Sequence, residues 1–231
     1  MTNPIIFYWI QHTLLRVSIV LDQTALNTDL AASSALSTLK WAQEEFGKDL
    51  CLLSSMQDAV LIDLAMQVSP AIDIVFLDTG YHFTETWDTL SMVEQRYDVT
   101  VKVISAPATS TRGSVRPGEC CDVKASLLDE ALRNRRAWLT GARRAEAETR
   151  ARLELVSTDR HNKTKICPLA QWSDDDVARY VETRNVVTNP LIVQGYPSIG
   201  CAICTTKPLQ GAHPRSGRWS GTARTECGLH L

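Results

Sequence analysis

The sequence predicts an α/β protein with a mostly parallel, twisted sheet, helices on both faces of that sheet, and a loop-rich C-terminal tail. From about residue 31, short apolar runs typical of buried strands alternate with segments whose apolar residues recur at helical spacing. Residues 196–231 are instead rich in Gly, Pro, Cys, Arg and Thr, which is typical of loops. The chain of 231 residues is long enough for one substantial domain.

The predicted strands are short apolar runs, and they lie at residues 50–53, 72–77, 99–104 and 137–140. The predicted helices have apolar residues at helical spacing, and they lie at residues 34–46, 59–68, 84–96, 123–136 and 173–183. Gly47 can end the first helix, and Pro70 closes the second. Ser173 suits the N-cap of the last helix, whose first turn is acidic and complements the helix dipole. Residues 107–118 are predicted to form a polar loop.

Residues 1–30 are treated as an N-terminal extension without assigned structure. The run from Ile5 to Leu21 is apolar, but Gln11, His12 and Arg16 interrupt it, and it is too short and too polar for a membrane span. It has neither a clear basic stretch before it nor a clear small-residue cleavage site after it, so it does not read as a secretory signal. We therefore expect a cytoplasmic protein that does not enter a membrane.

The sequence contains seven cysteines, which is an odd number, and the chain is not small. Without a secretory signal, such cysteines are more typical of metal binding or thiolate chemistry than of a disulfide framework. Cys51 falls on a predicted buried strand and is interpreted as a small core hydrophobe, and Cys167 is interpreted in the same way.

Polar turns follow two of the predicted strands, Ser54 to Asp58 and Asp78 to Gly80. In parallel sheets, ligands bind beyond the carboxyl ends of the strands, where both turns would lie. Hydroxyl and backbone N–H groups at a strand-to-helix turn can hold phosphate. The first turn lacks the glycines and the lysine of a Walker loop, however, and an ordinary helix cap explains it equally well.

Two pairs of cysteines could supply four thiolates to one metal centre: Cys120 with Cys121, and Cys201 with Cys204. Structural zinc and iron–sulfur clusters both take four cysteine ligands, so the spacing favours a metal without choosing between zinc and iron. The alternative is a single redox or zinc half-site at Cys201 and Cys204, with two buried cysteines elsewhere.

A further cysteine, Cys227, lies in the tail between Arg224 and His230, where it can be held as a thiolate and reach a substrate. An incidental tail cysteine is the alternative. Guanidinium groups suit phosphate and sulfate because their donors fork onto paired oxygens, although most surface charges are only solvated. The net charge is −2, and no basic stripe favours nucleic acid as a partner.

Taken together, the segments resemble the adenylyl sulfate / phosphoadenylyl sulfate reductase family. The resemblance runs from about Trp41 to the C-terminus, and SIGCxxCT combined with TECGLH is its most specific part. The matching segments are SSMQDAVLIDLA, VFLDTGYHFTET, ECC, WLTGARR, PLAQWSDDDVARYV, NPLIVQGYPSIGCAICT, RSGRW and TECGLH.

The resemblance implies an adenine-nucleotide alpha-hydrolase-like fold with a reductase domain at 31–204 and a catalytic tail at 205–231. It implies that Cys227 attacks the sulfate group of adenylyl sulfate, that AMP leaves, and that thioredoxin releases sulfite. It gives a 4Fe-4S cluster to Cys120, Cys121, Cys201 and Cys204. The expected contacts to substrate are Ser54, Ser55, Asp58, Leu77, Asp78, Thr79, Gly80, Lys124, Arg143, Arg144, Arg215, Arg218 and His230.

The sequence departs from the family pattern beside the cysteine pair. Family members usually read CCxxRK, whereas this chain reads CCDVKA, so that Lys124 remains and Ala125 replaces a lysine. Three other functions stay open: reduction of the 3′-phosphorylated sulfonucleotide, an ATP-cleaving nucleotidyl transferase on the same fold, and a zinc-stabilised binding module. A homo-oligomer is compatible with the sequence.

Overall fold

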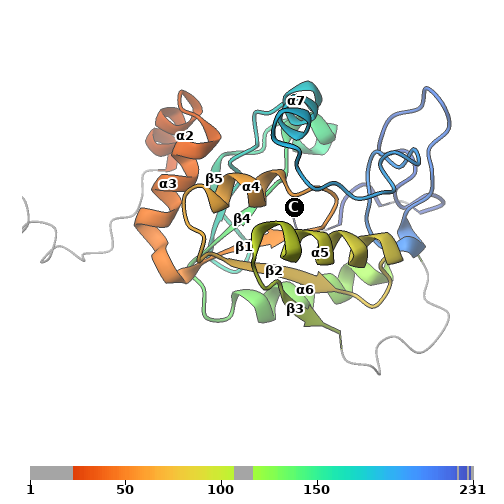
Figure 1. Ribbon diagram of the computed structural model, residues 1–231, viewed down its shortest axis with the longest axis horizontal. Coiled ribbons are helices and arrows are strands. Elements are labelled where there is room, and N and C mark those ends of the chain that lie inside the picture. The colour runs from red at the N-terminus through yellow and green to blue at the C-terminus, as the bar shows by residue number, and fades with distance from the viewer. Residues whose placement is uncertain (1–22, 107–116, 223, 228, 230–231) are drawn as a thin grey trace, which may run out of the picture.

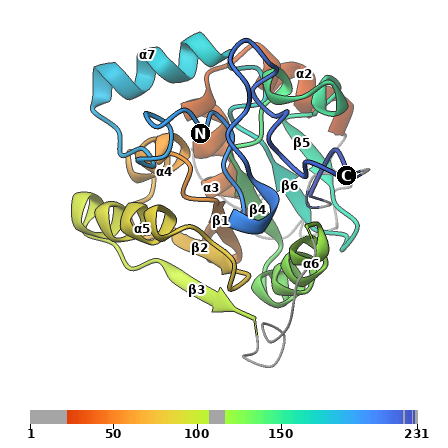
Figure 2. The same ribbon diagram turned by 90° about the vertical axis from the view of Figure 1, so that its right-hand side faces the viewer.

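The computed structural model describes residues 23–106, 117–222, 224–227 and 229, and its fold is drawn in Figures 1 and 2. Within these residues the strands form one sheet in the order β3-β2-β1-β4-β6-β5, and every neighbouring pair is parallel except the antiparallel pair of β5 and β6. The strands are β1 (Leu50–Ser54), β2 (Asp73–Asp78), β3 (Lys102–Ser105), β4 (Ala137–Thr140), β5 (Val156–Thr158) and β6 (Thr164–Ile166).

Helices cover both faces of the sheet, as predicted (Figure 2). The α-helices are α2 (Gln23–Ala31), α3 (Ala35–Phe46), α4 (Val60–Met66), α5 (Thr84–Tyr97), α6 (Glu119–Leu132) and α7 (Asp174–Arg184). The short 3₁₀ turns are η1 (Gly47–Asp49), η3 (Arg144–Glu146), η4 (Glu148–Arg150) and η5 (Ala202–Cys204). Among the described helices, none is both long enough and apolar enough to cross a lipid bilayer.

The alternation of side chains along each strand builds two separate cores. Leu50 and Leu52 of β1 face the core shared with α3, α4 and α5. Cys51 and Leu53, which alternate with them along β1, face the core that α6 covers. Successive side chains of a strand point to opposite faces, so a strand buried on both faces must be apolar throughout. This explains why the central runs at residues 50–53 and 74–77 are continuous in the sequence rather than alternating.

Local signals place several helix ends as predicted. Ser34 caps α3 by accepting a hydrogen bond from the Ser37 backbone N–H, and Gly47 follows the helix with a φ of 50°. Ser173 and Asp176 form the reciprocal capping box that opens α7.

Three predicted boundaries are wrong. α6 begins at Glu119 rather than at residue 123 and ends at Leu132 rather than at residue 136, so the cysteine pair lies in its first turn. Because those cysteines face the tail instead of the sheet, the apolar residues that recur at helical spacing and face the core begin only after the start of the helix. β3 begins at Lys102 rather than at residue 99, because the Glu94 carboxylate accepts the Val101 N–H at 2.8 Å and withholds it from the strand ladder.

The sequence also missed the β5–β6 hairpin and helix α2. Both strands of the hairpin are only three residues long. α2 packs beside β5, where the Asn27 amide donates to the Val156 carbonyl at 2.7 Å and accepts the Val156 N–H at 2.9 Å. The apolar run at residues 5–21 and nearly all of the predicted loop at 107–118 lie outside the described residues.

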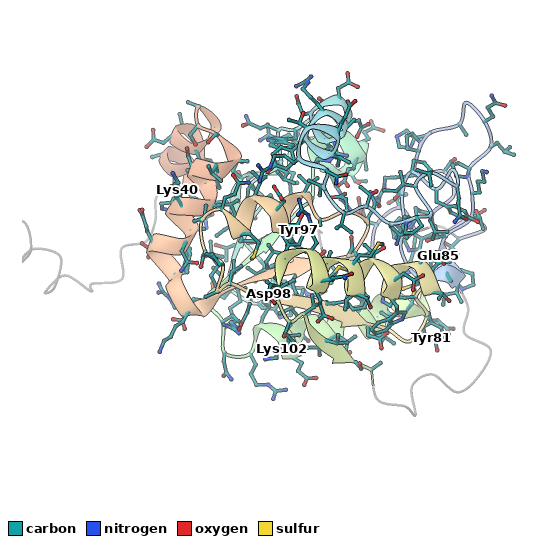
Figure 3. All side chains as sticks on the ribbon, in the orientation of Figure 1. Lys40, Tyr81, Glu85, Tyr97, Asp98 and Lys102 are labelled. Atoms are coloured by element: carbon teal, nitrogen blue, oxygen red, sulfur yellow. The ribbon has the colours of Figure 1, made fainter. Side chains whose placement is uncertain are left out.

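A buried carboxylate ties three helices together above the sheet. Asp63 of α4 accepts hydrogen bonds from the hydroxyls of Tyr180 at 2.7 Å and Tyr97 at 3.3 Å, and it pairs with Arg184. Tyr97 is labelled in Figure 3, at the end of α5 beside α4. The contact fixes α4, α5 and α7 relative to one another, and so it supports the first polar turn, which leads into α4.

Candidate active site

A pocket opens where the order of the strands reverses. β2 lies on one side of β1 and β4 lies on the other, so the connections that follow these strands leave in opposite directions. This is the switch point at which α/β sheets bind ligands. The pocket has an empty volume of about 1040 Å³, part of which is open solvent, and its lining includes eight residues predicted from the sequence: Ser54, Ser55, Asp58, Leu77, Lys124, Arg215, Arg218 and Cys227.

The first polar turn is held in place by the segment that precedes the second cysteine pair. Fully buried Asn189 donates its backbone N–H to the Gln57 carbonyl at 2.9 Å and its side-chain amide to the Met56 carbonyl at 3.2 Å. Met56 itself has a positive φ of 57°, a strained conformation for this residue type. The turn is therefore fixed rather than free to adapt.

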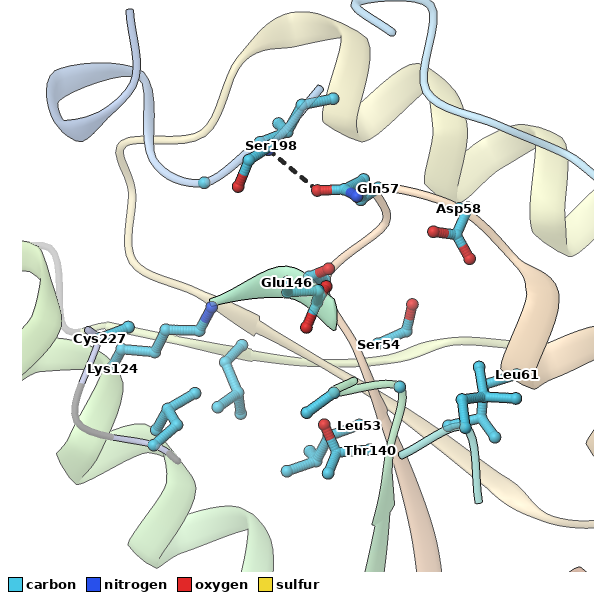
Figure 4. Close-up of a pocket in the computed structure, with 18 of the residues that line it drawn as sticks. Leu53, Ser54, Gln57, Asp58, Leu61, Lys124, Thr140, Glu146, Ser198 and Cys227 are labelled. Atoms are coloured by element: carbon cyan, nitrogen blue, oxygen red, sulfur yellow. Dashed lines mark hydrogen bonds between the residues drawn. The ribbon is translucent and has the colours of Figure 1, made fainter. Parts of the chain in front are cut away.

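Two polar side chains of this turn accept hydrogen bonds from nearby backbone N–H groups. The Ser54 hydroxyl accepts the Met56 N–H at 3.2 Å, and the Asp58 carboxylate accepts the Val60 N–H at 3.1 Å. Burial raises the pKa of Asp58, and the hydrogen bond from Val60 opposes this rise only partly. Figure 4 shows Ser54 and Asp58 on the wall of the pocket, and the Gln57 side-chain oxygen accepts a hydrogen bond from the Ile199 N–H at 2.9 Å.

The second polar turn supports the cysteines more than it lines the pocket. Of the predicted residues there, Leu77 reaches the pocket lining, whereas Asp78, Thr79 and Gly80 do not. The Asp78 carboxylate accepts the Gly80 N–H at 2.8 Å. The hydroxyl of the fully buried Thr79 lies 3.1 Å from the Cys201 sulfur.

His82 stabilises the second turn in its neutral form. Its Nε2 lies 3.1 Å from the Leu77 carbonyl oxygen and 3.4 Å from the Thr79 nitrogen, so one neutral tautomer donates to the carbonyl and the other accepts the Thr79 N–H. Burial, and to a lesser degree the charge of Lys124, lowers the pKa of His82 from 6.5 to about 4. A histidine whose pKa is lower in the folded chain stabilises the fold fully above its unfolded pKa. That stability is lost as the pH falls through the window from 6.5 to about 4.

Between pH 7 and pH 4.5, we expect the free energy of unfolding of a His82→Gln variant to fall less than that of the parent. The difference between the two decreases should reach up to about 3 kcal/mol. Glutamine can still donate to the Leu77 carbonyl but does not titrate. Urea unfolding at several pH values measures the effect, with the exposed His213→Gln variant as the control. An identical pH dependence for the His82→Gln variant and the parent would contradict this assignment.

Four cysteine thiols meet between α6 and η5, and we call them the cysteine quartet (Cys120, Cys121, Cys201 and Cys204). Each is at most 6% exposed, and the Cys120 and Cys204 sulfurs approach to 2.9 Å. Donors surround the quartet: the Gly118 N–H lies 3.1 Å from the Cys204 sulfur, and the Trp219 indole N–H lies 3.4 Å from the Cys121 sulfur. The structure thus brings together the two pairs that the sequence identified.

This donor set fits an iron–sulfur cluster. It contains only sulfur ligands, and N–H and O–H groups directed at the sulfurs stabilise thiolates bound to such clusters. Within the described residues, no three Cys, His, Asp or Glu side chains are placed to hold a single metal ion. A cluster bound through one thiolate per iron does not require that arrangement.

Two of the predicted arginines gather around Trp219. The Arg218 guanidinium lies 4.5 Å from the indole centroid and donates to the Ser198 hydroxyl at 3.2 Å and to the Ile199 carbonyl at 3.1 Å. Its Nε is buried without a partner among the described residues, leaving one donor unused beside the pocket. The Arg215 guanidinium lies 5.4 Å from the same centroid. Trp219 therefore connects the pocket cations to the quartet.

The other predicted arginines are engaged elsewhere. Arg143 pairs with Asp174 at 2.7 Å and lines a neighbouring cavity that also contains Arg215. Arg144 donates to the Leu153 carbonyl at 2.7 Å and lies outside the pocket lining. His230 lies outside the described residues.

Sequence reasoning missed two charged residues at this site, Arg150 and Glu226. Arg150 is 8% exposed and lines the pocket, and Glu226 is 4% exposed and precedes Cys227. Arg150 lies in a run of charged residues that is typical of a solvated helix, so its burial has no local signal. The position of Glu226 inside the TECGLH segment was the one available indication.

The Cys227 thiol completes the pocket. Cys227 packs against the quartet and Trp219, and Figure 4 shows this residue beside Lys124, whose ammonium group points into the pocket. A hydrogen bond with Cys121, followed by burial, raises the pKa of Cys227, whereas the charges of Lys124 and Arg218 act to lower it. A cysteine thiol, four cationic side chains and the thiols of the quartet thus converge at the end of the sheet, the cationic residues being Lys124, Arg150, Arg215 and Arg218.

Residues 50–207 match the family described as the phosphoadenosine phosphosulfate reductase domain. This chain belongs to that family. One relative is the adenosine 5′-phosphosulfate reductase of Mycolicibacterium smegmatis, which is 46% identical over 214 residues covering 88% of this chain and 91% of the relative.

Solved structures show the same fold as the one found for this family member. The phosphoadenylyl-sulfate reductase of Candida auris, solved as a phosphate complex, superposes with a TM-score of 0.68 at 24% identity, covering 80% of this chain and 96% of the other. The FMN adenylyltransferase of Candida glabrata gives a TM-score of 0.56 at 14% identity, covering 75% and 62%. At these identities the likeness shows the fold alone, and it confirms the adenine-nucleotide alpha-hydrolase-like architecture.

Proposed function

We propose that this chain reduces adenylyl sulfate to sulfite and AMP, with Cys227 as the nucleophile. One observation carries the proposal: the Cys227 thiol lies in the switch-point pocket together with Lys124, Arg215 and Arg218. A sulfur nucleophile among cations suits a substrate that joins a sulfate to a phosphate. The printed name of the 46% identical relative agrees with this substrate.

The first step transfers the sulfuryl group to the enzyme. The Cys227 thiolate attacks the sulfur of the sulfate, a sulfur–sulfur bond forms, and the bond from that sulfur to the bridging oxygen breaks. AMP leaves with the electron pair of the broken bond, and Cys227 becomes an S-sulfocysteine. Lys124 and Arg218 favour this step because they face both the thiolate and the growing charge on the leaving phosphate.

The second step releases the product by thiol exchange. A thiolate of a dithiol reductant, which we propose to be thioredoxin, attacks the Cys227 sulfur and expels sulfite with the electron pair of the sulfur–sulfur bond. The second thiol of the reductant then resolves the mixed disulfide and frees Cys227. The two electrons that reduce the sulfate group therefore come from the dithiol.

We propose that the quartet holds one 4Fe-4S cluster, which when bound would fix α6 and η5 together and add its charge to the field at the pocket. Trp219 lies between that position and both arginines, so it transmits the geometry of the quartet to the anion site. All seven cysteines are free thiols, which suits the reducing cytoplasm that we propose as the location.

The adenosine is proposed to lie against the apolar wall of the pocket near Leu53 and Leu77, with its phosphosulfate over the turn from Ser54 to Asp58. Arg215 and Arg218 are the proposed anion contacts. Arg143 is a weaker candidate because Asp174 already occupies its guanidinium.

An anaerobic single-turnover experiment tests the function. Radiolabelled adenylyl sulfate should release one equivalent of AMP, leave the label on the peptide containing Cys227, and yield sulfite only after a dithiol is added. The protein should contain about four irons per chain. Free sulfate in place of an adduct would overturn the proposal, as would a colourless zinc protein without an adduct. Release of pyrophosphate from ATP would favour a nucleotidyl transferase instead.

Selectivity is tested in the same assay with the 3′-phosphorylated sulfonucleotide as the competing substrate. If the 3′-phosphorylated compound forms the adduct faster than adenylyl sulfate does, it replaces adenylyl sulfate as the proposed substrate.

A further inference from the structure

The tail segment that carries Cys227 is held mainly by side chains. Among the described residues, no backbone–backbone hydrogen bond involves residues 225–227. Its position therefore depends on the contacts that the neighbours of Cys227 make. Two of these neighbours are anchored, and Glu226 is the more deeply buried of them.

The Glu226 carboxylate accepts hydrogen bonds from four donor groups. Arg150 donates Nε to one carboxylate oxygen and Nη2 to the other, both at 2.8 Å, which is the bidentate geometry of strong guanidinium–carboxylate pairs. The Thr149 hydroxyl donates at 3.0 Å, and Arg215 donates at 3.2 Å. We call this contact the carboxylate clamp (Arg150, Thr149 and Arg215 around Glu226).

The clamp requires a charged carboxylate. Glu226 is 4% exposed, and burial alone would raise its pKa, but the hydrogen bonds and charges of Arg150 and Arg215 outweigh burial and hold the pKa of Glu226 below its ordinary value. Two guanidinium groups converge there, and Glu146 also pairs with Arg150. Removing the charge of Glu226 would leave buried cations undercompensated, which is far more costly than losing a surface pair.

A second, apolar anchor lies on the other side of Cys227. Leu229 packs against the core beneath α6, which contains Leu128 and Trp138. Cys227 is thus bracketed by a buried carboxylate and a docked aliphatic side chain. Consecutive Cα atoms are about 3.8 Å apart, so fixing Glu226 fixes the thiol within a small volume.

We propose that Glu226 is a positioning residue that docks the tail through the carboxylate clamp and thereby places the Cys227 sulfur in the pocket. This inference rests on the proposed function. It adds a residue that acts only through Cys227 and whose negative charge is opposite to that of the two arginines it contacts. The same guanidinium groups that line the pocket are the ones that hold the tail in place.

A Glu226→Gln variant tests the charge requirement while preserving the shape of the side chain. The rate of adduct formation in a single turnover should fall about 30-fold, as expected when charge-assisted hydrogen bonds are lost. AMP binding, measured by calorimetry, should not weaken, because Arg150 and Arg215 remain. A Glu226→Asp variant keeps the charge on a shorter side chain and should recover part of the rate. The matched control is Glu148→Gln, an exposed glutamate close to Arg150, which should match the parent.

A second measurement does not depend on catalysis. If the clamp docks the tail, the Cys227 thiol of the Glu226→Gln protein should react several-fold faster with iodoacetamide than that of the parent, while the iron content stays unchanged. Equal alkylation rates and equal adduct rates in the two proteins would overturn the inference.

The two proposals fail in different ways. If the parent forms no adduct on Cys227, the proposed function fails, and the alkylation rates still decide whether Glu226 docks the tail. If the parent forms the adduct and Glu226→Gln forms it equally fast, only the positioning role of Glu226 fails.

Discussion

A Cys227→Ser variant is expected to lose sulfite formation by about 10³-fold or more. A serine hydroxyl is not ionised near neutral pH and cannot form the sulfur–sulfur bond that carries the sulfuryl group. Serine is nearly the same size as cysteine, so the carboxylate clamp and the docking of Leu229 should persist. Dithiol-dependent sulfite release measures the effect, and AMP binding by calorimetry should match that of the parent.

The control for this prediction is Cys51→Ala. Cys51 is fully buried on β1 and faces the core under α6, and burial raises its pKa to about 12, so this thiol is inert. The alanine variant should form the adduct normally. Sulfite release at the parental rate by the Cys227→Ser variant would remove the basis of the proposed chemistry.

A Gly200→Ala variant is expected to lower kcat/KM by about 100-fold by displacing Arg218. A Cβ atom added at Gly200 would lie 2.2 Å from Nη2 and 2.6 Å from Cζ of Arg218, so the guanidinium must move. Moving it breaks its bonds to Ser198 and Ile199 and its contact with Trp219. Steady-state kinetics measure the loss, and urea unfolding shows whether the fold persists.

The matched control is Gly211→Ala, whose added Cβ meets nothing within 4 Å although the φ there is positive. That variant carries backbone strain without a steric contact and should keep its activity. An Arg218→Met variant should reproduce the loss seen for Gly200→Ala. Parental kcat/KM in a folded Gly200→Ala protein would show that the position of Arg218 does not limit the reaction.

The sequence predicts the centre of the fold better than its margins. The strand segments at 50–53 and 137–139 are continuous apolar runs because both sheet faces are covered, so their signal is strong and local. The hairpin of β5 and β6 has three residues per strand and carries almost no periodic signal. The start of α6 is set by where Cys120 and Cys121 must point, which depends on the distant segment that ends in Cys204.

The candidate site shows the same division between local and distant causes. Cys227, Lys124 and Arg218 belong to recognisable segments, and the structure brings them into one pocket. The pairing of Arg150 with Glu226 joins residues 76 positions apart, and no pattern within either segment predicts it. Arg144 illustrates the opposite case, since it lies in a recognisable segment yet its guanidinium is bound to the Leu153 carbonyl.

The amide of Asn27 bears on how copies of this protein can associate. By bonding to both backbone groups of Val156, it acts as a one-residue substitute for a further strand at the β5 border. A sheet whose border is already satisfied in this way offers little to the backbone of another molecule. Any assembly of several copies is therefore expected to use contacts between side chains on helices or loops, rather than a sheet continued from one subunit into the next through β5.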